Sequence, residues 1–387
     1  MLSDGWGISN VRNFNMPNTR DVLGDIQTLG AIVDGTISEF VDDVADSVLV
    51  SAFAYCSALT SVSLPACTSV NVAAFGYCYS LATVILPACT SVSNYAFAYC
   101  SALATVNLPS CVYLETNAFN GCRALTSIDL PACKTVGTYA FYNCSSLTSI
   151  NLPSCTYVNN YAFAGCYSLT SIDLPVCTRV GSMAFQSCYS LTTVSLPVCT
   201  RVESSAFCFC SALTIVSLPS CTSVESNAFY RCGSLTTVNL PVCTAVKSMA
   251  FQSCYSITTV SLPVCTYVGG YVFYYCSALT SVDLPSCSSV GTYAFQGCRS
   301  LTTVSLPVCT YVGVNVFRGC YNLISLYLTS VSSVPALAGN PFESTPIGGY
   351  STSAGRYGSV FVPASLYQDF LTANYWSTIS SRIVSVA

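Results

Sequence analysis

Cysteine is the residue type whose number and spacing could support the most chemistry in this chain. The 387 residues include 26 Cys, and from Cys56 to Cys320 one falls at every eleventh position, with Cys208 as an extra. Such an array could form a ladder of disulfides, bind metal ions, or supply small buried side chains.

The spacing favours buried thiols over the other two uses. Structural metal sites need close pairs such as C-x2-C, and the repeating array has none. Side chains stacked in parallel keep their Cβ atoms farther apart than the roughly 3.8 Å that a disulfide prefers. Reduced thiols also fit folding in a cytoplasm better than on an export route. Typical members of the array are Cys144, Cys155 and Cys166.

Groups for acid–base catalysis are scarce. The chain has no His, which excludes His general bases and His-containing triads. Asp129 and Asp173 share a register two repeats apart, roughly 10 Å at strand spacing, which is near the long limit for an inverting carboxylate pair. A flat repeat face desolvates such a pair poorly. We therefore expect no enzymatic activity, no cofactor and no metal.

A period of 22 residues must position all these groups. Phe recurs every 22 residues from Phe53 to Phe317, a Leu-Pro pair follows eleven residues after each of the first twelve, and the copies have no insertions. A fixed period of this length is the signature of a solenoid. The expected core includes the column members Phe141, Phe163 and Phe185.

The strand of each repeat has the leucine-rich-repeat pattern. Leu147, Ile150 and Leu152 follow L-x-x-L-x-L, and Pro153 ends the strand because it cannot donate to the ladder. The sequence therefore predicts a β-rich, α/β-type leucine-rich-repeat solenoid with one parallel sheet and 22-residue coils. The alternative is a parallel β-helix, with two or three strands per coil.

Three parts of the chain are distinguished by their match to the repeat. Residues 1–36 do not match and are expected to be an N-terminal attachment or capping segment. Residues 37–329 form the solenoid of about 13 coils, the first of them degenerate, and residues 330–387 form a C-terminal cap of mixed structure.

The composition of the chain argues against two kinds of interaction, with nucleic acid and across a membrane. Charged residues are only 7% of the chain and the net charge is −4, with the basic residues dispersed, so we expect no nucleic-acid partner. No run of eighteen apolar residues is present, so we expect no membrane-spanning helix. The N-terminus lacks the pattern of a secretory signal, and we expect assembly in the cytoplasm.

Two outward-facing columns are the candidate binding surface. Tyr offers large contact area at low entropic cost, and the strand face carries small polar side chains. Tyr that simply packs over the coil edges is the alternative reading. The tyrosines are Tyr79, Tyr167, Tyr189, Tyr255 and Tyr321. The polar strand residues are Asn107, Asp129, Asn151, Asp173, Asn239 and Asp283.

The repeat unit, strand-Leu-Pro…Val…Ala-Phe-x-x-Cys, resembles the BspA-like, or Treponema-type, leucine-rich repeat family. The tail from Phe342 through Thr345-Pro-Ile347 and Val360-Phe-Val-Pro363 to Trp376 is similar to the cap that often follows such repeats. The chain differs in its Cys after Leu-Pro and in a unit one residue shorter. The resemblance implies bacterial surface adhesins and phage tail-associated proteins, and it implies no catalytic residues.

The expected function is therefore recognition or adhesion. The first expectation is a phage tail-associated receptor-binding protein in the virion, contacting a bacterial surface glycan or protein. It would contact other virion proteins through its N-terminal segment, and oligomers are compatible with this role. The alternatives are an adhesin on the bacterial cell surface that binds host protein or glycan, and a structural, self-assembling rod.

Overall fold

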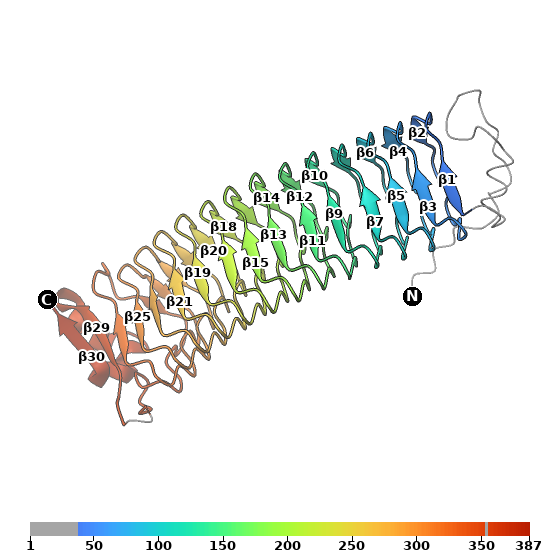
Figure 1. The fold of residues 1–387 in the computed structure, drawn as a ribbon. Helices are drawn as coiled ribbons and strands as arrows, with labels where there is room; N and C mark the ends of the chain where they lie inside the picture. Colours follow the sequence, from blue (N-terminus) through green and yellow to red (C-terminus); the bar gives the residue numbers. More distant parts are fainter. Residues whose placement is uncertain (1–37, 353–354) are drawn as a thin grey trace.

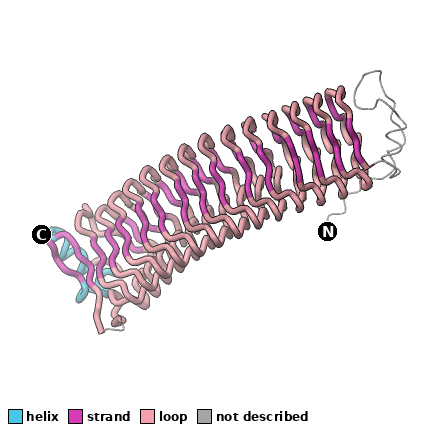
Figure 2. The backbone as a smooth tube through the Cα atoms, in the orientation of Figure 1, coloured by secondary structure: helices cyan, strands magenta, loops and turns pink. Residues whose placement is uncertain are grey.

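The computed structural model describes residues 38–352 and 355–387 and shows a slender, gently bent rod (Figure 1). Residues of the predicted N-terminal segment, 1–36, lie outside the described part. Each 22-residue coil contributes one three-residue strand and one two-residue strand, joined by turns (Figure 2). Among the described residues, no helix has the length and apolar character needed to cross a membrane.

The three-residue strands stack in parallel along one face of the rod. Ser61, Val62 and Ser63 pair with the residues 22 positions later, and the same shift recurs along the ladder. Hydrogen bonding is interrupted after β7, β11 and β17, which divides the ladder into segments. The strands are β1 (Glu39–Val41), β3 (Ser61–Ser63), β5 (Thr83–Ile85), β7 (Thr105–Asn107), β9 (Ser127–Asp129), β11 (Ser149–Asn151), β13 (Ser171–Asp173), β15 (Thr193–Ser195), β17 (Ile215–Ser217), β19 (Thr237–Asn239), β21 (Thr259–Ser261), β23 (Ser281–Asp283), β25 (Thr303–Ser305) and β27 (Ser325–Tyr327).

The two-residue strands form a second, continuous ladder of 14 strands. They are β2 (Ser47–Val48), β4 (Ser69–Val70), β6 (Ser91–Val92), β8 (Tyr113–Leu114), β10 (Thr135–Val136), β12 (Tyr157–Val158), β14 (Arg179–Val180), β16 (Arg201–Val202), β18 (Ser223–Val224), β20 (Ala245–Val246), β22 (Tyr267–Val268), β24 (Ser289–Val290), β26 (Tyr311–Val312) and β28 (Ala336–Leu337).

The leucine-rich-repeat solenoid with 22-residue coils is confirmed, and one detail of its prediction is corrected. The sequence predicts one parallel sheet, whereas the coils also form a second ladder of two-residue strands. Two strands per coil is the feature expected of the alternative, a parallel β-helix. The second strand has only two residues, however, which is too short to show an alternation of apolar and polar residues in the sequence. Most of the remaining coil is turn.

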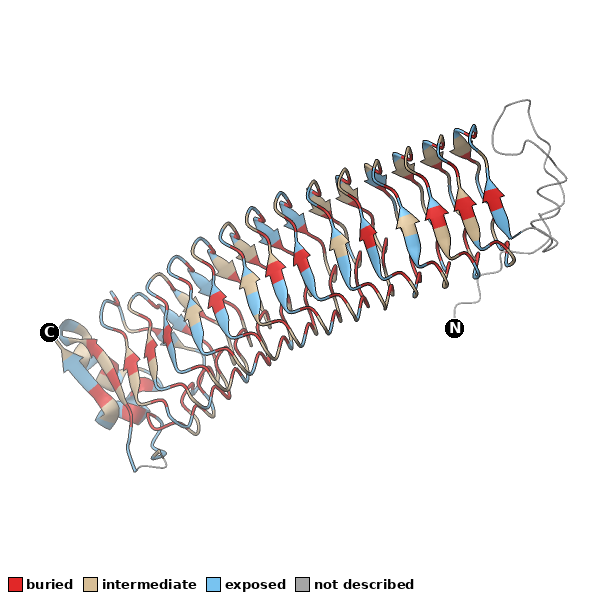
Figure 3. Ribbon diagram, viewed as in Figure 1, coloured by how far each residue is buried: buried red, intermediate tan, exposed pale blue. Residues whose placement is uncertain are grey.

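The predicted phenylalanine column forms the centre of the core. Ring centroids of Phe141 and Phe163 lie 5.2 Å apart, those of Phe163 and Phe185 lie 5.1 Å apart, and each pair is nearly parallel. All three side chains are fully buried, as are the middle residues of most three-residue strands (Figure 3). The expected alignment of successive Phe residues is confirmed.

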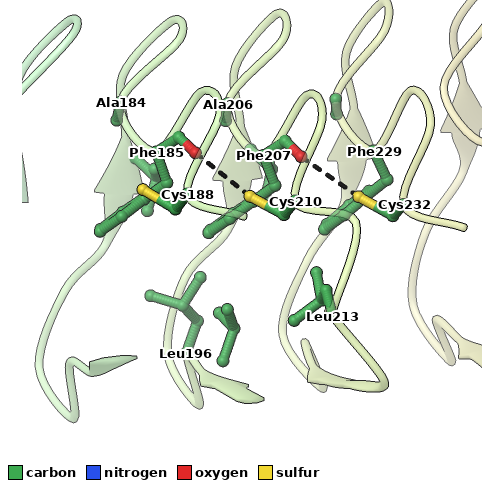
Figure 4. Packing of buried hydrophobic residues seen from close by; sticks show 14 of the residues in the cluster. Ala184, Phe185, Cys188, Leu196, Ala206, Phe207, Cys210, Leu213, Phe229 and Cys232 are labelled. Atoms are coloured by element: carbon green, nitrogen blue, oxygen red, sulfur yellow. Dashed lines mark hydrogen bonds between the residues drawn. The ribbon is translucent and has the colours of Figure 1, made fainter. Parts of the chain in front are cut away.

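The cysteines make the second set of core columns, and in the eleven-residue array each thiol from Cys67 to Cys320 donates to a backbone carbonyl. Cys210 donates to the carbonyl of Phe185 at 3.1 Å, one coil earlier, and Cys232 donates likewise to Phe207 (Figure 4). In the other column Cys155 donates to Tyr157 of its own coil at 3.4 Å. All 26 cysteines are buried, as the sequence predicted, and none is bonded to another in this structure.

Two turns in each coil have left-handed backbone, with φ between 53° and 77°. One lies two residues after the column Phe: Tyr55, Tyr77, Tyr99, Gly121, Asn143, Gly165, Ser187, Phe209, Arg231, Ser253, Tyr275, Gly297 and Gly319. The other lies two residues before it: Ser51, Ala73, Tyr95, Asn117, Tyr139, Tyr161, Met183, Ser205, Asn227, Met249, Tyr271, Tyr293 and Asn315. We call these the following-turn and preceding-turn columns.

The C-terminal segment covers the last coil. It contains β29 (Ser359–Pro363), η2 (Ala364–Leu366), α2 (Tyr367–Thr372), η3 (Trp376–Arg382) and β30 (Ile383–Val386). Phe342 extends the Phe stack at 5.9 Å from Phe317. Buried Trp376 packs on Phe342 and donates its indole N–H to the carbonyl of Pro335 at 2.9 Å. The domain boundaries at residues 36 and 329 remain predictions.

Candidate binding surface

The five predicted tyrosines are all exposed, but only two of them meet each other. Each lies four residues after a column Phe, just before a three-residue strand. Tyr167 and Tyr189 stack at 5.4 Å, and Tyr79 contacts Tyr77 edge to face at 6.2 Å. Tyr255 and Tyr321 stand on separate coils with 51% and 53% of their surface exposed. The column is therefore a set of spaced aromatic contacts rather than one patch.

The six predicted polar residues all lie exposed at the third position of their strands. Asn107, Asn239 and Asp283 stand on β7, β19 and β23. Asn151 lies on the coil between those of Asp129 and Asp173 and donates to Asp129 Oδ1 at 2.8 Å. The Asp129 carboxylate, one member of the hypothetical catalytic pair, thus accepts a hydrogen bond from an amide.

The tyrosines of the left-handed turns are a feature that the sequence analysis missed. Tyr55, Tyr77 and Tyr99 stack in one row, with ring centroids 4.7 Å and 4.9 Å apart. Shorter rows join Tyr139 to Tyr161 at 4.7 Å and Tyr271 to Tyr293 at 4.8 Å. The available signal was the recurrence of Tyr two residues before or after the column Phe.

Charged residues also gather more than the sequence indicated. On the second ladder Glu203 is held by Arg179, with Nη2 and Oε1 2.6 Å apart, and by Arg201 at 3.3 Å. Arg201 reaches Glu225 at 3.3 Å, and Arg179 lies over the ring of Tyr157. Because these charged groups pair with one another, they stabilise this part of the surface and leave little unpaired charge for a partner.

Tyr321 lines a small pocket with two arginines, Arg299 and Arg318, that the sequence analysis did not select. The pocket has a volume of about 270 Å³ and lies at the turns before β25 and β27. In this pocket a predicted tyrosine and exposed positive charge line the same hollow.

The cysteines are chemically quiet in the folded chain. Burial raises the pKa of the Cys56 thiol to about 11 and that of Cys155 to about 12. A thiol in this state is neutral at neutral pH and is neither a good nucleophile nor a ready metal ligand. Within residues 38–352 and 355–387, no group of three His, Cys, Asp or Glu is arranged to hold a metal.

Stacked 22-residue coils, a strand ladder with L-x-x-L-x-L spacing and a polar outer face define a leucine-rich-repeat solenoid. The family model for the BspA-type leucine-rich repeat region matches residues 46–154, 134–258 and 244–349, and the chain belongs to that family. Proteins of this family generally act in surface adhesion or protein interaction.

Similar solved structures include one whose fold agrees with that of this chain over most of its length. A leucine-rich repeat protein from Bacteroides ovatus is 21% identical, with a TM-score of 0.57 over 89% of this chain and 88% of that one. A leucine-rich cell surface protein from Faecalibacterium prausnitzii is 23% identical over 77% of this chain and 88% of that one, with a TM-score of 0.46. No functionally curated protein matches the sequence significantly.

Proposed function

We propose that this chain is a non-enzymatic recognition protein that attaches to a surface bearing glycan or protein. The observation that carries the proposal is the placement of tyrosines at left-handed turn positions, where each is exposed or half-buried rather than in the core. The same columns accept Gly, Asn and Ser in other coils, so the fold does not require Tyr there.

Stability alone does not account for these tyrosines. A bulky residue in left-handed backbone costs roughly 1–2 kcal/mol relative to glycine, and a stacked aromatic pair returns about 0.5–1.5 kcal/mol. For the row of Tyr55, Tyr77 and Tyr99, three strained residues cost about 3–6 kcal/mol in total and two stacked pairs return about 1–3 kcal/mol, so stacking offsets only part of the strain. Contact with a partner is then the remaining use for the aromatic surface that these tyrosines leave accessible.

The proposed carrier is a phage tail, on which the chain would serve as receptor-binding protein for a bacterial surface. The support is thiol chemistry, since 26 buried thiols that stay reduced suit folding in a cytoplasm before release. The second candidate carrier is the bacterial cell surface, favoured by the family's general role in adhesion. A self-assembling rod is the third candidate, because a solenoid can join copies end to end.

Binding to glycan arrays and to intact bacteria tests the recognition role. Three double variants would each break the stacking of one row: Tyr77→Asn with Tyr99→Asn, Tyr139→Asn with Tyr161→Asn, and Tyr271→Asn with Tyr293→Asn. Asn suits left-handed backbone, so folding should be retained while attachment falls in at least one variant. Tyr350→Asn, at an exposed tyrosine outside the coils, is the control.

Absence of any glycan, protein or cell that binds the unaltered chain would defeat the recognition role. The carrier is tested separately, by probing particle and envelope fractions of the producing culture with an antibody to the chain. Filaments of the purified chain by electron microscopy, without binding to cells, would favour the structural rod.

A further inference from the structure

The pocket beside Tyr321 arises from two consecutive glycines in the following-turn column. Tyr275, Gly297 and Gly319 occupy this column on three successive coils, and Ser344, with φ of 58°, takes the next level. Elsewhere in the column, each glycine is followed on the next coil by a residue that has a side chain. Here two successive levels have none, and a hollow of about 270 Å³ opens between Tyr275 and Ser344.

The two glycines differ in how close their neighbours come. A Cβ built on Gly297 would lie 2.7 Å from Cδ1 of Tyr275, so the Tyr275 ring rests directly on that backbone. A Cβ on Gly319 would meet nothing closer than 3.9 Å. The floor at Gly319 is therefore open, and the Tyr275 ring forms one fixed end of the pocket.

Positive charge converges on this hollow in a chain that has little of it. Arg299 and Arg318, two of only twelve basic residues, both line the pocket. Within the described ranges Arg299 forms no ion pair, and Arg318 forms one exposed contact with Glu343 at 3.2 Å. That surface pair leaves most of the five guanidinium donors of Arg318 free.

An unpartnered amide completes the lining. Gln296 lines the pocket, and its buried Oε1 has no hydrogen-bond partner. Gln252 has the same unpartnered oxygen at the equivalent place two coils earlier, but it does not line this pocket. The amide is thus a repeated feature of the coil, and of these two glutamines only Gln296 lies beside the hollow.

We propose that this pocket binds one acidic sugar residue of a glycan, with the sugar carboxylate on Arg299 and Arg318. Guanidinium groups match carboxylates with paired N–H donors. Tyr275 and Tyr321 supply faces for the apolar side of the ring, while Gln296 and Ser344 serve its hydroxyls. The volume lies just under the roughly 300 Å³ at which drug-sized sites begin, which suits a single sugar residue.

The inference deepens the proposed function, because it names the ligand chemistry for one place on the recognition surface. Titration of the full chain with glucuronic acid and N-acetylneuraminic acid, followed by saturation-transfer NMR, tests it directly. Glucose is the neutral control, and glucose 6-phosphate distinguishes a carboxylate site from a general anion site. Binding of an acidic sugar, with weaker or no binding of the other two, is the expected result.

Two variants and one matched control assign the binding to this pocket. Arg299→Gln should weaken acidic-sugar binding about ten- to hundredfold, the usual size of a lost hydrogen bond to a charged group. Gly319→Tyr should abolish binding by filling the hollow, and its fold should survive because Tyr275 occupies the same column. Arg123→Gln changes an arginine at the same place in another coil and should leave binding unchanged.

Equal binding of glucose, preference for glucose 6-phosphate, or equal losses in Arg299→Gln and Arg123→Gln would overturn the inference. These outcomes are separable from failure of the proposed function. Attachment to cells without acidic-sugar binding overturns the pocket alone. Acidic-sugar binding without attachment to any cell or glycan surface supports the pocket and removes the proposed recognition role.

Discussion

At the residue scale, the thiol explains why Cys rather than Ala or Val fills two core columns. From Phe53 to Phe295, each Phe carbonyl of the column accepts a hydrogen bond from a cysteine thiol of the next coil, as that of Phe119 does from Cys144 at 3.1 Å. The same carbonyl also accepts the backbone N–H of Cys122 at 3.2 Å, so an alanine would remove the second of its two hydrogen bonds, at a cost of roughly 0.5–1.5 kcal/mol. A thiol supplies a weak donor and still packs as a small apolar group.

The same burial predicts a steep loss of stability at alkaline pH. Burial raises the pKa of Cys56 and Cys133 to about 11, above the ordinary value of 9.0. A raised pKa in the fold means full stability below pH 9.0 and progressive loss as pH rises from there towards 11. Each such thiol lowers the free energy of unfolding by roughly 1 kcal/mol for each pH unit above its ordinary pKa. About ten thiols together would therefore exceed the stability of a typical domain, roughly 5–15 kcal/mol, within one or two pH units.

Circular dichroism followed from neutral to alkaline pH measures this transition. We expect a flat signal up to pH 9.0 and then one cooperative loss of strand signal. Thiol titration at neutral pH is the control, with few reactive groups in the native chain and all 26 after unfolding without reductant. A chain that stays folded well above the raised pKa values would contradict the thiol account.

At the element scale, the left-handed turns are what the sequence could not predict. Phe, Leu and Cys columns follow from periodicity, because identical side chains at 22-residue steps can stack only in register. The turns break ordinary preference, since Tyr161 and Met183 have φ of 56° without being Gly or Asn. Backbone hydrogen bonds between coils impose that geometry, for instance from the N–H of Tyr161 to the carbonyl of Ser182 at 3.0 Å.

The pocket beside Tyr321 was predictable only in part, because only some of its residues belong to a periodic column. Tyr321 could be selected because its offset repeats in other coils. Arg299 and Arg318 stand at different offsets, and their meeting depends on the missing side chains of Gly297 and Gly319. A hollow made by absent side chains leaves no periodic signal in a sequence.

A pair of neighbouring serines tests the strain in these turns. Ser205 has φ of 58° and Ser204 lies outside the left-handed region. Ser205→Gly should stabilise the chain by about 1 kcal/mol through relief of strain, whereas Ser204→Gly should destabilise it by roughly 0.5–1 kcal/mol through added unfolded-state entropy. Urea unfolding midpoints measure both. Equal effects of the two substitutions would show that the turn geometry carries no strain.

At the scale of the whole molecule, a solenoid is a sum of similar coils closed at its end. Each coil contacts its neighbours alone, so stability is carried by coil interfaces rather than by one globular core. Trp376 and Phe342 close the Phe stack after the last coil, where an open level would expose apolar surface. Coils in the middle should therefore be interchangeable, while the end is not.

Removal of one complete coil tests this interchangeability. Deletion of residues 144–165 joins Asn143 to Cys166 in register and brings Phe141 next to Phe185. We expect a folded rod shortened by about one strand spacing, roughly 4.8 Å, with cooperative unfolding retained. Deletion of residues 144–154 is the matched control, because it keeps a Cys at every eleventh position but removes half a coil and one strand, β11. Small-angle scattering and urea unfolding should find that control disrupted, and equal behaviour of the two deletions would mean that the Cys spacing, rather than the stacked coil, sets the fold.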